Sequence, residues 1–276
     1  MSYADKIFIN DITNILDRGF SDENLNVRPK WSDGTPAHTK KLFCLVNRYN
    51  LANEFPIITV RKIQYKKAID ELLWIWSKKS NKIADLNSHI WDAWADENGT
   101  IGKAYGYQLN VKHKYSEGMF DQVDRVLYDL KNNPQSRRIL TNIFVHSDLN
   151  EMALYPCAYS LTFNVAGDVL NMVLNQRSQD MIVANNWNVV QYAVLQHMMA
   201  QVSGFKVGEF VHIIADAHIY DRHFPIAKEI IKNPIYDAPL LRLNPDIKNF
   251  YDFTVDDVEI VSYEATPLKK PLEVAE

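Results

Sequence analysis

Apolar residues recur along the chain with two different periods. Intervals of three and four residues are typical of a helix that buries one face. Residues 188–204 show them most clearly, and Gly204 provides a stop. The same spacing predicts three more helices, at 5–18, 65–79 and 120–133. Strict alternation of apolar and polar residues predicts a strand. Alternation or apolar runs place strands at 42–51, 137–145, 158–165, 169–178 and 209–220, and the last β-structure within 250–263.

Two stretches between these elements have a different composition. Residues 22–40 contain two prolines, a glycine and many polar side chains, which predicts a long loop. Residues 89–109 are rich in aromatic side chains and interrupted by glycines, which is more typical of a pocket wall than of a regular element. Helices and strands follow one another without strict βαβ alternation. We therefore expect an α+β fold: a single domain over residues 1–276, in which helices flank a large, mostly mixed β-sheet.

Composition narrows the class of protein. The 276 residues are 47% hydrophobic, enough to bury a full core. The net charge of −4 argues against a broad basic surface for nucleic acid, so an anionic ligand must be met by local Arg or Lys clusters. No apolar run approaches the ~18 residues of a membrane span. Two cysteines are too few for a disulfide framework, which fits a reduced, cytoplasmic compartment.

Cys157 is the first candidate for chemistry. It follows Pro156 at the start of a predicted strand. Cysteine reacts as the thiolate, and a nearby cation lowers its pKa. Arg177 lies on the next predicted strand and reaches the sulfur if the two strands are neighbours. The alternative is an inert thiol packed in the core, and that is our interpretation of Cys44, which lies between Phe and Leu in another strand.

A histidine-rich strand is the second candidate. His212, Asp216 and His218 have even spacings, so they share one face of a strand. Three interpretations stay open: a metal site, hydrogen bonds to a sugar or phosphate, or a polar strand end that leaves the core. The spacing matches no standard metal motif, so we expect no metal here.

Other residues admit a functional and a structural interpretation. Arg137 and Arg138 are adjacent, and a guanidinium binds phosphate through its planar fork, although a solvated pair is the alternative. Glu71 lies among apolar residues on a predicted helix, where it is either partly buried and ready to exchange protons or on an exposed face. Trp91 and Trp94 belong either to the core or to a pocket for a flat heterocycle.

Eight short stretches, taken together, resemble the thymidylate synthase family. They occur in the family's order and at about its spacing, from about residue 20 to residue 264. No single stretch is specific, but eight in order are not expected by chance. The segment VRPKWSDGTPAHT is similar to the variant subgroup found in bacilli and their phages. The eight stretches are ELLW (71–74), IWDAWADENG (90–99), YGYQ (105–108), SRRI (136–139), MALYPC (152–157), QRSQD (176–180), WNVVQYAVLQHMMAQ (187–201) and DAHIYDRH (216–223).

The resemblance implies a reaction. It implies a cytoplasmic homodimer that pairs through the sheet and methylates dUMP to dTMP. The cosubstrate would be 5,10-methylenetetrahydrofolate, which donates the one-carbon unit and a hydride and leaves as dihydrofolate. The family's chemistry uses no metal, and binding to RNA would be weak and secondary. Two alternatives stay open: a deoxynucleotide hydroxymethylase, in which water replaces the hydride, and a dUMP-binding paralogue without turnover.

The resemblance also implies roles for single residues. Cys157 corresponds to the nucleophile that attacks C6 of the pyrimidine, and Arg177 to the arginine that touches both that thiolate and the phosphate. Asn188 corresponds to the amide that reads O4 and N3 of uracil. Glu71 corresponds to the carboxylate that manages protons at O4 and the folate, and Tyr105 to a tyrosine near the C5 proton.

The remaining implied residues divide by ligand. Arg137 and Arg138 correspond to the pair that reaches the phosphate of the partner subunit's site, and Asp180 to a catalytic residue on the folate side. The other implied dUMP ligands are Arg28, Gln176, Ser178, His218 and Tyr220. The implied folate contacts are Glu71, Ile90, Trp91, Trp94, Asp180 and Trp187.

Four departures from the family's pattern leave details of the pocket open. Ala158 replaces the usual His after the nucleophile, although the variant subgroup also lacks it. Trp187 replaces a Phe and Ala184 a Gly, which changes the loop near the folate. The usual phosphate-loop Arg is missing, so Arg28 or Lys30 must supply its charge. The C-terminal segment folds over the ligands in this family, and here it runs slightly past the usual end.

Overall fold

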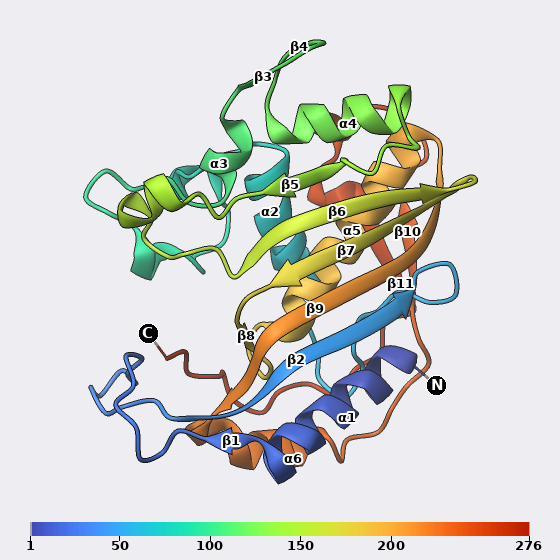
Figure 1. The fold of residues 1–276 in the computed structure, drawn as a ribbon. Helices are drawn as coiled ribbons and strands as arrows, with labels where there is room; N and C mark the ends of the chain where they lie inside the picture. Colours follow the sequence, from blue (N-terminus) through green and yellow to red (C-terminus); the bar gives the residue numbers. More distant parts are fainter. Residues whose placement is uncertain (1, 276) are drawn as a thin grey trace.

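The structure, a computed structural model, describes residues 2–275. A seven-stranded sheet runs through it in the order β1-β2-β9-β7-β6-β5, with β8 paired to β9 (Figure 1). β7 and β8 run parallel to β9, whereas every other neighbouring pair is antiparallel, so the predicted mixed sheet is confirmed. The strands are β1 (Phe20–Ser21), β2 (Thr39–Asn50), β5 (Leu140–Asn142), β6 (Ala158–Ala166), β7 (Val169–Gln176), β8 (Gln179–Asp180) and β9 (Lys206–Tyr220).

The helices pack on one side of this sheet. In Figure 1, α2 and α5 lie behind it, and no helix crosses the front of its central strands. The helix α5 is buried along most of its length because its apolar residues occur on nearly every side, and it ends at Gly204, whose φ is +78°. The α-helices are α1 (Tyr3–Arg18), α2 (Tyr65–Trp76), α3 (Gly106–Asn110), α4 (Gln122–Asn132), α5 (Asn185–Ser203) and α6 (Phe224–Ile230).

Smaller elements complete the fold. Two antiparallel hairpin-like pairs lie outside the main sheet: β3 (His113–Tyr115) with β4 (Gly118–Phe120), and β10 (Leu240–Leu243) with β11 (Val258–Val261). Short 3-10 turns join the larger elements. They are Ile83–Asp85, Asp92–Trp94, His146–Glu151, Asp221–His223, Phe250–Asp252 and Val255–Asp257.

Three predictions from the sequence need correction. The strand predicted at 137–145 is paired only at Leu140–Asn142, because the two preceding arginines lie in an exposed turn. The β-structure predicted within 250–263 is confined to Val258–Val261, since two capped 3-10 turns precede it. The interpretation of Cys44 as a packed core thiol is wrong: its φ is +55° and its side chain is exposed.

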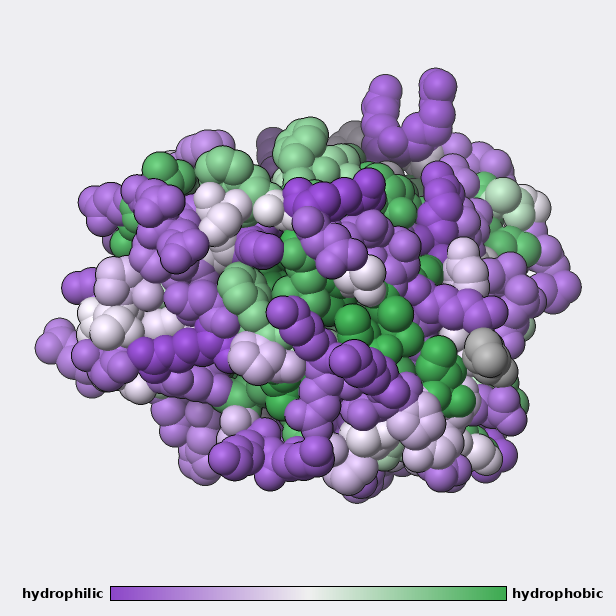
Figure 2. Space-filling view, turned by 90° about the horizontal axis from the view of Figure 1, so that it is seen from below, coloured by the Kyte–Doolittle hydropathy of each residue, from purple (hydrophilic) through white to green (hydrophobic). Residues whose placement is uncertain are grey.

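The surface mixes polar and apolar residues. The face in Figure 2 is mostly hydrophilic, and its apolar residues gather towards the middle. None of the helices in the described part of the chain is both long and apolar enough to span a membrane. On the main sheet, Phe43 and Val46 of β2 and Leu140 of β5 are exposed, at 88%, 50% and 49%. These strands therefore present apolar side chains that no other part of the described chain covers.

Candidate active site

The strand register brings Cys157 and Arg177 together. β6 and β7 are antiparallel, and Ala158 at the start of β6 lies opposite Gln176 at the end of β7. Cys157 and Arg177 are the next residues outward on each strand, and the Arg177 N–H donates to the Cys157 carbonyl oxygen at 2.9 Å. Two residues that are 20 positions apart in the sequence thus become neighbours at one end of the sheet.

The Arg177 guanidinium is held in place by main-chain oxygens. Its Nε donates to Pro156 O at 3.0 Å and its Nη2 to Tyr155 O at 2.7 Å. The same Nη2 lies 3.6 Å from Cys157 Sγ. Burial raises the pKa of the half-buried Cys157 thiol, and the positive charge of Arg177 lowers it. The guanidinium therefore offsets part of the cost of forming a thiolate at this position.

Tyr105 forms the other side of the sulfur's surroundings. Its hydroxyl oxygen accepts the Cys157 N–H at 3.2 Å, and burial raises the pKa of its phenol well above the ordinary value. The Tyr105 backbone has φ +45°, a region that costs a bulky residue energy and that often occurs at functional sites. Gly106 permits this turn, because a Cβ there would lie 2.2 Å from Ser80 O.

Glu71 is a buried carboxylate with three side-chain donors. The indole of Trp91 donates to its Oε1 at 2.6 Å, and the indole of Trp187 and the amide of Gln191 donate to its Oε2 at 2.5 and 2.7 Å. Burial raises the pKa of Glu71, while these hydrogen bonds lower it. The buried interpretation of Glu71 is thus the observed one. A phenylalanine at position 187 would have no N–H to donate, so Trp187 supplies a partner that this carboxylate would otherwise lack.

Asn188 lies between Glu71 and the end of β7. Its Nδ2 donates to Gln191 Oε1 at 3.0 Å, and its Oδ1 accepts from Gln176 and Gln179 at 3.2 and 3.3 Å. Sequence reasoning missed Gln179 and Gln191. Gln179 precedes Asn188 by nine residues, and this spacing does not predict a contact. Gln191 follows Asn188 by three residues on the same helix, and residues three apart lie on one helix face, so the sequence could have indicated this contact.

A polar pocket opens beside Arg177. It has a volume of about 420 Å³, and three cationic side chains, Arg28, Lys41 and Arg177, line it. His218 Nδ1 lies 2.9 Å from Asp216 Oδ1, and the rings of His218 and Tyr220 meet edge to face at 5.1 Å. The pocket is lined by Asp22, Val27, Arg28, Pro29, Ala37, Thr39, Lys41, Arg177, Ser178, Asp216, His218 and Tyr220. Arg28 lies in this lining and Lys30 does not, so Arg28 is the better placed of the two candidate cations.

His212 lies apart from this pocket. It is fully buried, its Nε2 lies 2.8 Å from Gln176 Oε1, and burial lowers the pKa of its imidazole to about 3. His212 therefore contacts Gln176 from the protein interior, whereas Asp216 and His218 on the same strand line the pocket. Within residues 2–275, no group of three or more His, Cys, Asp or Glu side chains is arranged so that it could hold a metal ion.

Of the residues expected on the folate side, Trp91 and Trp187 donate to Glu71. Trp94 packs edge to face on Trp91 at 5.5 Å and, like Ile90, is half-buried. Asp180 Oδ1 accepts the backbone N–H groups of residues 182 and 183 and so shapes the loop before α5. Arg61, which sequence reasoning missed, is buried, and its Nε and Nη2 have no acceptor in the described chain. Burial lowers the pKa of Arg61 to about 10, and the charge of Asp180 opposes that effect.

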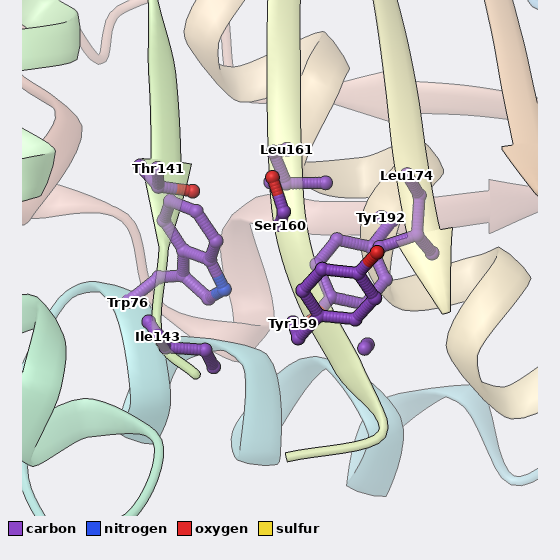
Figure 3. A pocket seen from close by; sticks show the side chains of 9 residues that line it. Trp76, Thr141, Ile143, Tyr159, Ser160, Leu161, Leu174 and Tyr192 are labelled. Carbon is purple, nitrogen blue, oxygen red and sulfur yellow. The ribbon is translucent and has the colours of Figure 1, made fainter. Parts of the chain in front are cut away.

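Ala158 faces a different part of the interior. It lines a small cavity of about 10 Å³ between the sheet and the helices, where Figure 3 shows the indole of Trp76 and the ring of Tyr192. The cavity is lined by Trp76, Thr141, Ile143, Ala158, Tyr159, Ser160, Leu161, Leu174 and Tyr192. The donors to Glu71 thus come from Trp187, Trp91 and Gln191, and the position after Cys157 contributes none of them.

Two further segments that were expected to contribute to the site are the turn with Arg137 and Arg138 and the C-terminal segment. Arg137 and Arg138 are exposed in a turn and do not line the pocket beside Arg177 of their own chain. The C-terminal segment is held by Glu273, whose carboxylate accepts from Ser32 Oγ at 2.6 Å and from Arg222 Nη1 at 3.2 Å. It therefore lies against the loop of residues 31–36, whose neighbours Arg28 and Pro29 line the pocket.

Fold and site together define a class: an α+β protein that places a cysteine–arginine pair beside a cationic pocket and a buried carboxylate. The chain belongs to the thymidylate synthase family, because the family model "Thymidylate synthase" matches residues 6–275.

Similar proteins cover the chain almost completely. The thymidylate synthase of Bacillus licheniformis is 48% identical over 268 residues, which are 95% of this chain and 96% of that protein. The thymidylate synthase of Bacillus phage phi3T is 46% identical with the same coverage. The solved structure of the thermostable thymidylate synthase A from Bacillus subtilis aligns with a TM-score of 0.95 at 44% identity and covers 100% of both chains. The resemblance to the bacillus and phage subgroup is confirmed.

Proposed function

We propose that this protein is an enzyme that methylates dUMP to dTMP, with 5,10-methylenetetrahydrofolate as donor of the one-carbon unit and of a hydride. The observation that carries the proposal is the Cys157–Arg177 pair, in which a guanidinium lies 3.6 Å from a half-buried sulfur. Such a pair suits covalent catalysis, since a thiolate adds to an electron-poor carbon and later leaves. Membership of the thymidylate synthase family supports the choice of reaction.

The first covalent step belongs to Cys157. Its thiolate adds to C6 of the pyrimidine, and the electron pair of the C5–C6 bond moves to C5 and O4. The bond between N10 of the folate and its one-carbon unit breaks to give an iminium ion on N5, C5 forms a bond to that carbon, and C5 then loses its proton. Elimination of the folate amine leaves an exocyclic methylene, a hydride from the folate reduces it to a methyl group, and the thiolate leaves C6. The folate is thereby oxidised to dihydrofolate.

Buried polar groups would transfer the protons that this series of reaction steps requires. Trp91, Trp187 and Gln191 each donate a hydrogen bond to the Glu71 carboxylate. The raised pKa of Glu71 suits a group that exchanges protons. The Tyr105 hydroxyl, which accepts the Cys157 N–H, would lie near the proton that C5 loses. Both groups are buried, and closure of the C-terminal segment over the ligands would exclude water from them.

The pocket beside Arg177 suits the sugar and phosphate of dUMP. Arg28, Arg177 and the Ser178 hydroxyl would bind the phosphate, and His218 and Tyr220 the 3′-hydroxyl. Gln176 and Asn188 would contact the base, which would then lie between the pocket and Glu71. Trp94, Trp187 and Ile90 would pack on the flat folate rings. The unpartnered, buried Arg61 adds a positive charge beside Asp180, which fits a cosubstrate that carries carboxylates.

We also propose that residues 1–276 form one domain that acts as a cytoplasmic homodimer with shared active sites. The apolar side chains exposed on β2 and β5 suit burial against a second copy of the sheet. Arg137 and Arg138 have no role in their own pocket, and their exposure leaves them free to bind the phosphate in the partner's site.

The product assay tests the reaction. Purified protein with dUMP and 5,10-methylenetetrahydrofolate should produce dihydrofolate, seen as an increase in absorbance, and a nucleotide whose mass is that of dTMP. A product with the mass of the hydroxymethyl compound would instead identify a hydroxymethylase. Binding of dUMP without any product would identify a paralogue without turnover.

A mixing experiment tests the shared site. One variant carries Cys157→Ser, and the other carries Arg137→Ala with Arg138→Ala, so neither homodimer has a complete site. Subunits exchanged at random should regain about a quarter of the wild-type activity, because each mixed dimer contains one complete site. A mixture that is no more active than its two components would show that each chain builds its own site.

A further inference from the structure

We propose that Gln191 and Gln179 are positioning residues that orient the side-chain amide of Asn188 for uracil, and that Gln191 also connects this amide to Glu71. The inference rests on the proposed function and concerns how that site distinguishes uracil from cytosine. Its basis is a continuous series of hydrogen bonds that runs through the side chains of α5 and the end of β7.

The series begins at His212 and ends at Glu71. His212 Nε2 lies 2.8 Å from Gln176 Oε1, and Gln176 Nε2 donates to Asn188 Oδ1 at 3.2 Å. Asn188 Nδ2 donates to Gln191 Oε1 at 3.0 Å, and Gln191 Nε2 donates to Glu71 Oε2 at 2.7 Å. Every donor points towards the carboxylate, so its negative charge strengthens each hydrogen bond behind it.

Main-chain carbonyl groups decide the direction of this series. A carbonyl oxygen only accepts hydrogen bonds, so an amide beside it must turn its NH2 group towards it. Gln191 Nε2 donates to Ala68 O at 3.1 Å, which leaves Gln191 Oε1 facing Asn188. On the other side, Gln176 Nε2 donates to Ser178 O at 3.1 Å and Gln179 Nε2 to Asp180 O at 3.3 Å.

Asn188 is therefore oriented from two sides. Two NH2 groups, from Gln176 and Gln179, face its oxygen, and one oxygen, from Gln191, faces its nitrogen. Turning the Asn188 amide over would place NH2 against NH2 and oxygen against oxygen. Buried polar groups that lose their partners are costly, so the reversed amide is strongly disfavoured.

The observed orientation suits uracil. The second hydrogen of Asn188 Nδ2 can donate to a carbonyl oxygen at C4 of the base. The N3–H group of the base can then donate to Oδ1 by replacing one of its two long contacts, at 3.2 or 3.3 Å. Cytosine has an amino group at C4 and an unprotonated N3, so it would require the reversed amide. Gln179 and Gln191 thus act through Asn188 without touching the base.

The helix makes the link to Glu71 short. Gln191 follows Trp187 by four residues and Asn188 by three, so all three side chains share one face of α5. Gln191 is 3% exposed, and its amide forms direct hydrogen bonds with both Glu71 and Asn188. The residue that reads the base and the carboxylate that exchanges protons are thereby coupled through one side chain.

The test compares two buried glutamines of α5. Gln191→Met removes the amide at nearly constant volume, and Gln196→Met is the matched control, because the Gln196 amide donates only to Leu170 O and Glu209 O. Dissociation constants of dUMP and dCMP are measured by calorimetry with each full-length protein. In Gln191→Met, the preference for dUMP over dCMP should fall by about tenfold or more, whereas Gln196→Met should keep the wild-type preference even if its melting temperature falls.

A second variant separates the two contacts of Gln191. Gln191→Glu keeps an oxygen that accepts from Asn188 but replaces the donor to Glu71 by a second carboxylate. It should keep the preference for dUMP while kcat falls by about tenfold or more. This variant decides the question if Gln191→Met does not fold.

Two outcomes would overturn the inference. One is an unchanged preference for dUMP in Gln191→Met, and the other is a Gln191→Glu variant with wild-type kcat or with its preference lost. Either result, in a series whose wild-type protein forms dTMP, leaves the proposed reaction intact. A wild-type protein that forms no dTMP would instead reject the proposed function itself.

Discussion

Arg177 Nη2 lies 3.6 Å from Cys157 Sγ and, at the same time, 2.7 Å from Tyr155 O. The hydrogen bond to the main chain holds the guanidinium at this distance before any ligand binds. A charge that is already in position costs no reorganisation when the thiolate forms. The sulfur, although half-buried, is thus placed where its reactivity depends on one neighbouring cation.

Replacing the nucleophile tests this arrangement most directly. Cys157→Ser should reduce dTMP formation more than about 10³-fold, because a hydroxyl group beside Arg177 does not ionise near neutral pH. The circular dichroism spectrum and dUMP binding should persist, since serine is almost the same size. Turnover close to that of the wild-type protein would reject covalent catalysis by Cys157.

Removing the cation should change the reactivity of the thiol. Burial raises the pKa of Cys157 and Arg177 lowers it, so Arg177→Met should move that pKa further upwards. The thiolate fraction at neutral pH then falls, and alkylation by iodoacetamide slows. The measurement is the alkylation rate against pH.

The second thiol must be absent from that experiment. Cys44 is exposed and would also react, so both proteins carry Cys44→Ser. Identical pH profiles with and without the Arg177 guanidinium would show that it does not activate the sulfur.

Trp187 should set the proton affinity of Glu71. Trp187→Phe removes an indole donor at 2.5 Å, and because this hydrogen bond lowers the pKa of Glu71, that pKa should rise further. If the ionised carboxylate is needed for turnover, the acid limb of the kcat–pH profile moves to higher pH. Trp74→Phe is the control: its indole donates to Lys82 O, so the variant should lose stability without moving that limb.

Asp11 should make stability depend on pH. Burial raises the pKa of this carboxyl from 3.8 to about 6, while its contact with Asn47 opposes the change. The folded state therefore holds the proton more tightly than the unfolded chain. The stabilisation is fully present below pH 3.8 and is lost as the pH rises to about 6, for a total of about 3 kcal/mol.

Asp11→Asn removes this titration and keeps an oxygen for Asn47. The free energy of unfolding of the variant should therefore increase, relative to that of the wild type, by about 2.4 kcal/mol between pH 4 and pH 7, so the variant becomes the more stable of the two as the pH rises. Urea denaturation at the two pH values measures it. A difference that is the same at both values would show that Asp11 does not titrate in this range.

Glu273 should hold the C-terminal segment in place. Glu273→Gln removes the charge that faces Arg222, so the segment should be released more often and carboxypeptidase should digest it faster. The KM for the folate should rise by about two- to fivefold, the range of a partly exposed ion pair. The matched control is Glu264→Gln, an exposed glutamate just before this segment, which should change neither quantity. Equal digestion of both variants would contradict the role of Glu273.

Several of these elements could be predicted because their causes are local. The spacing of apolar residues in α1 and α4 and the alternation in β7 depend only on which face each side chain occupies, so the predicted bounds are close to the observed ones. The β-structure predicted within 250–263 is confined to Val258–Val261, because capped 3-10 turns satisfy the backbone hydrogen bonds of the residues before it. Cys44 was misjudged because a φ of +55° turns its side chain out of an apolar run.

The sequence by itself determined the four longest helices, most strands and, through its motifs, the family and the candidate cysteine, arginine and asparagine. Only the tertiary structure decided which partners those residues meet. Gln191 and Glu71 are 120 residues apart, and Trp187 and Glu71 are 116 apart, yet their side chains share one hydrogen-bonded carboxylate. The physical reason is that periodicity describes the surroundings of a residue along its own element. Contacts between elements depend on the placement of β9 between β2 and β7 and on the packing of α5 against α2, which arise only when the whole chain folds.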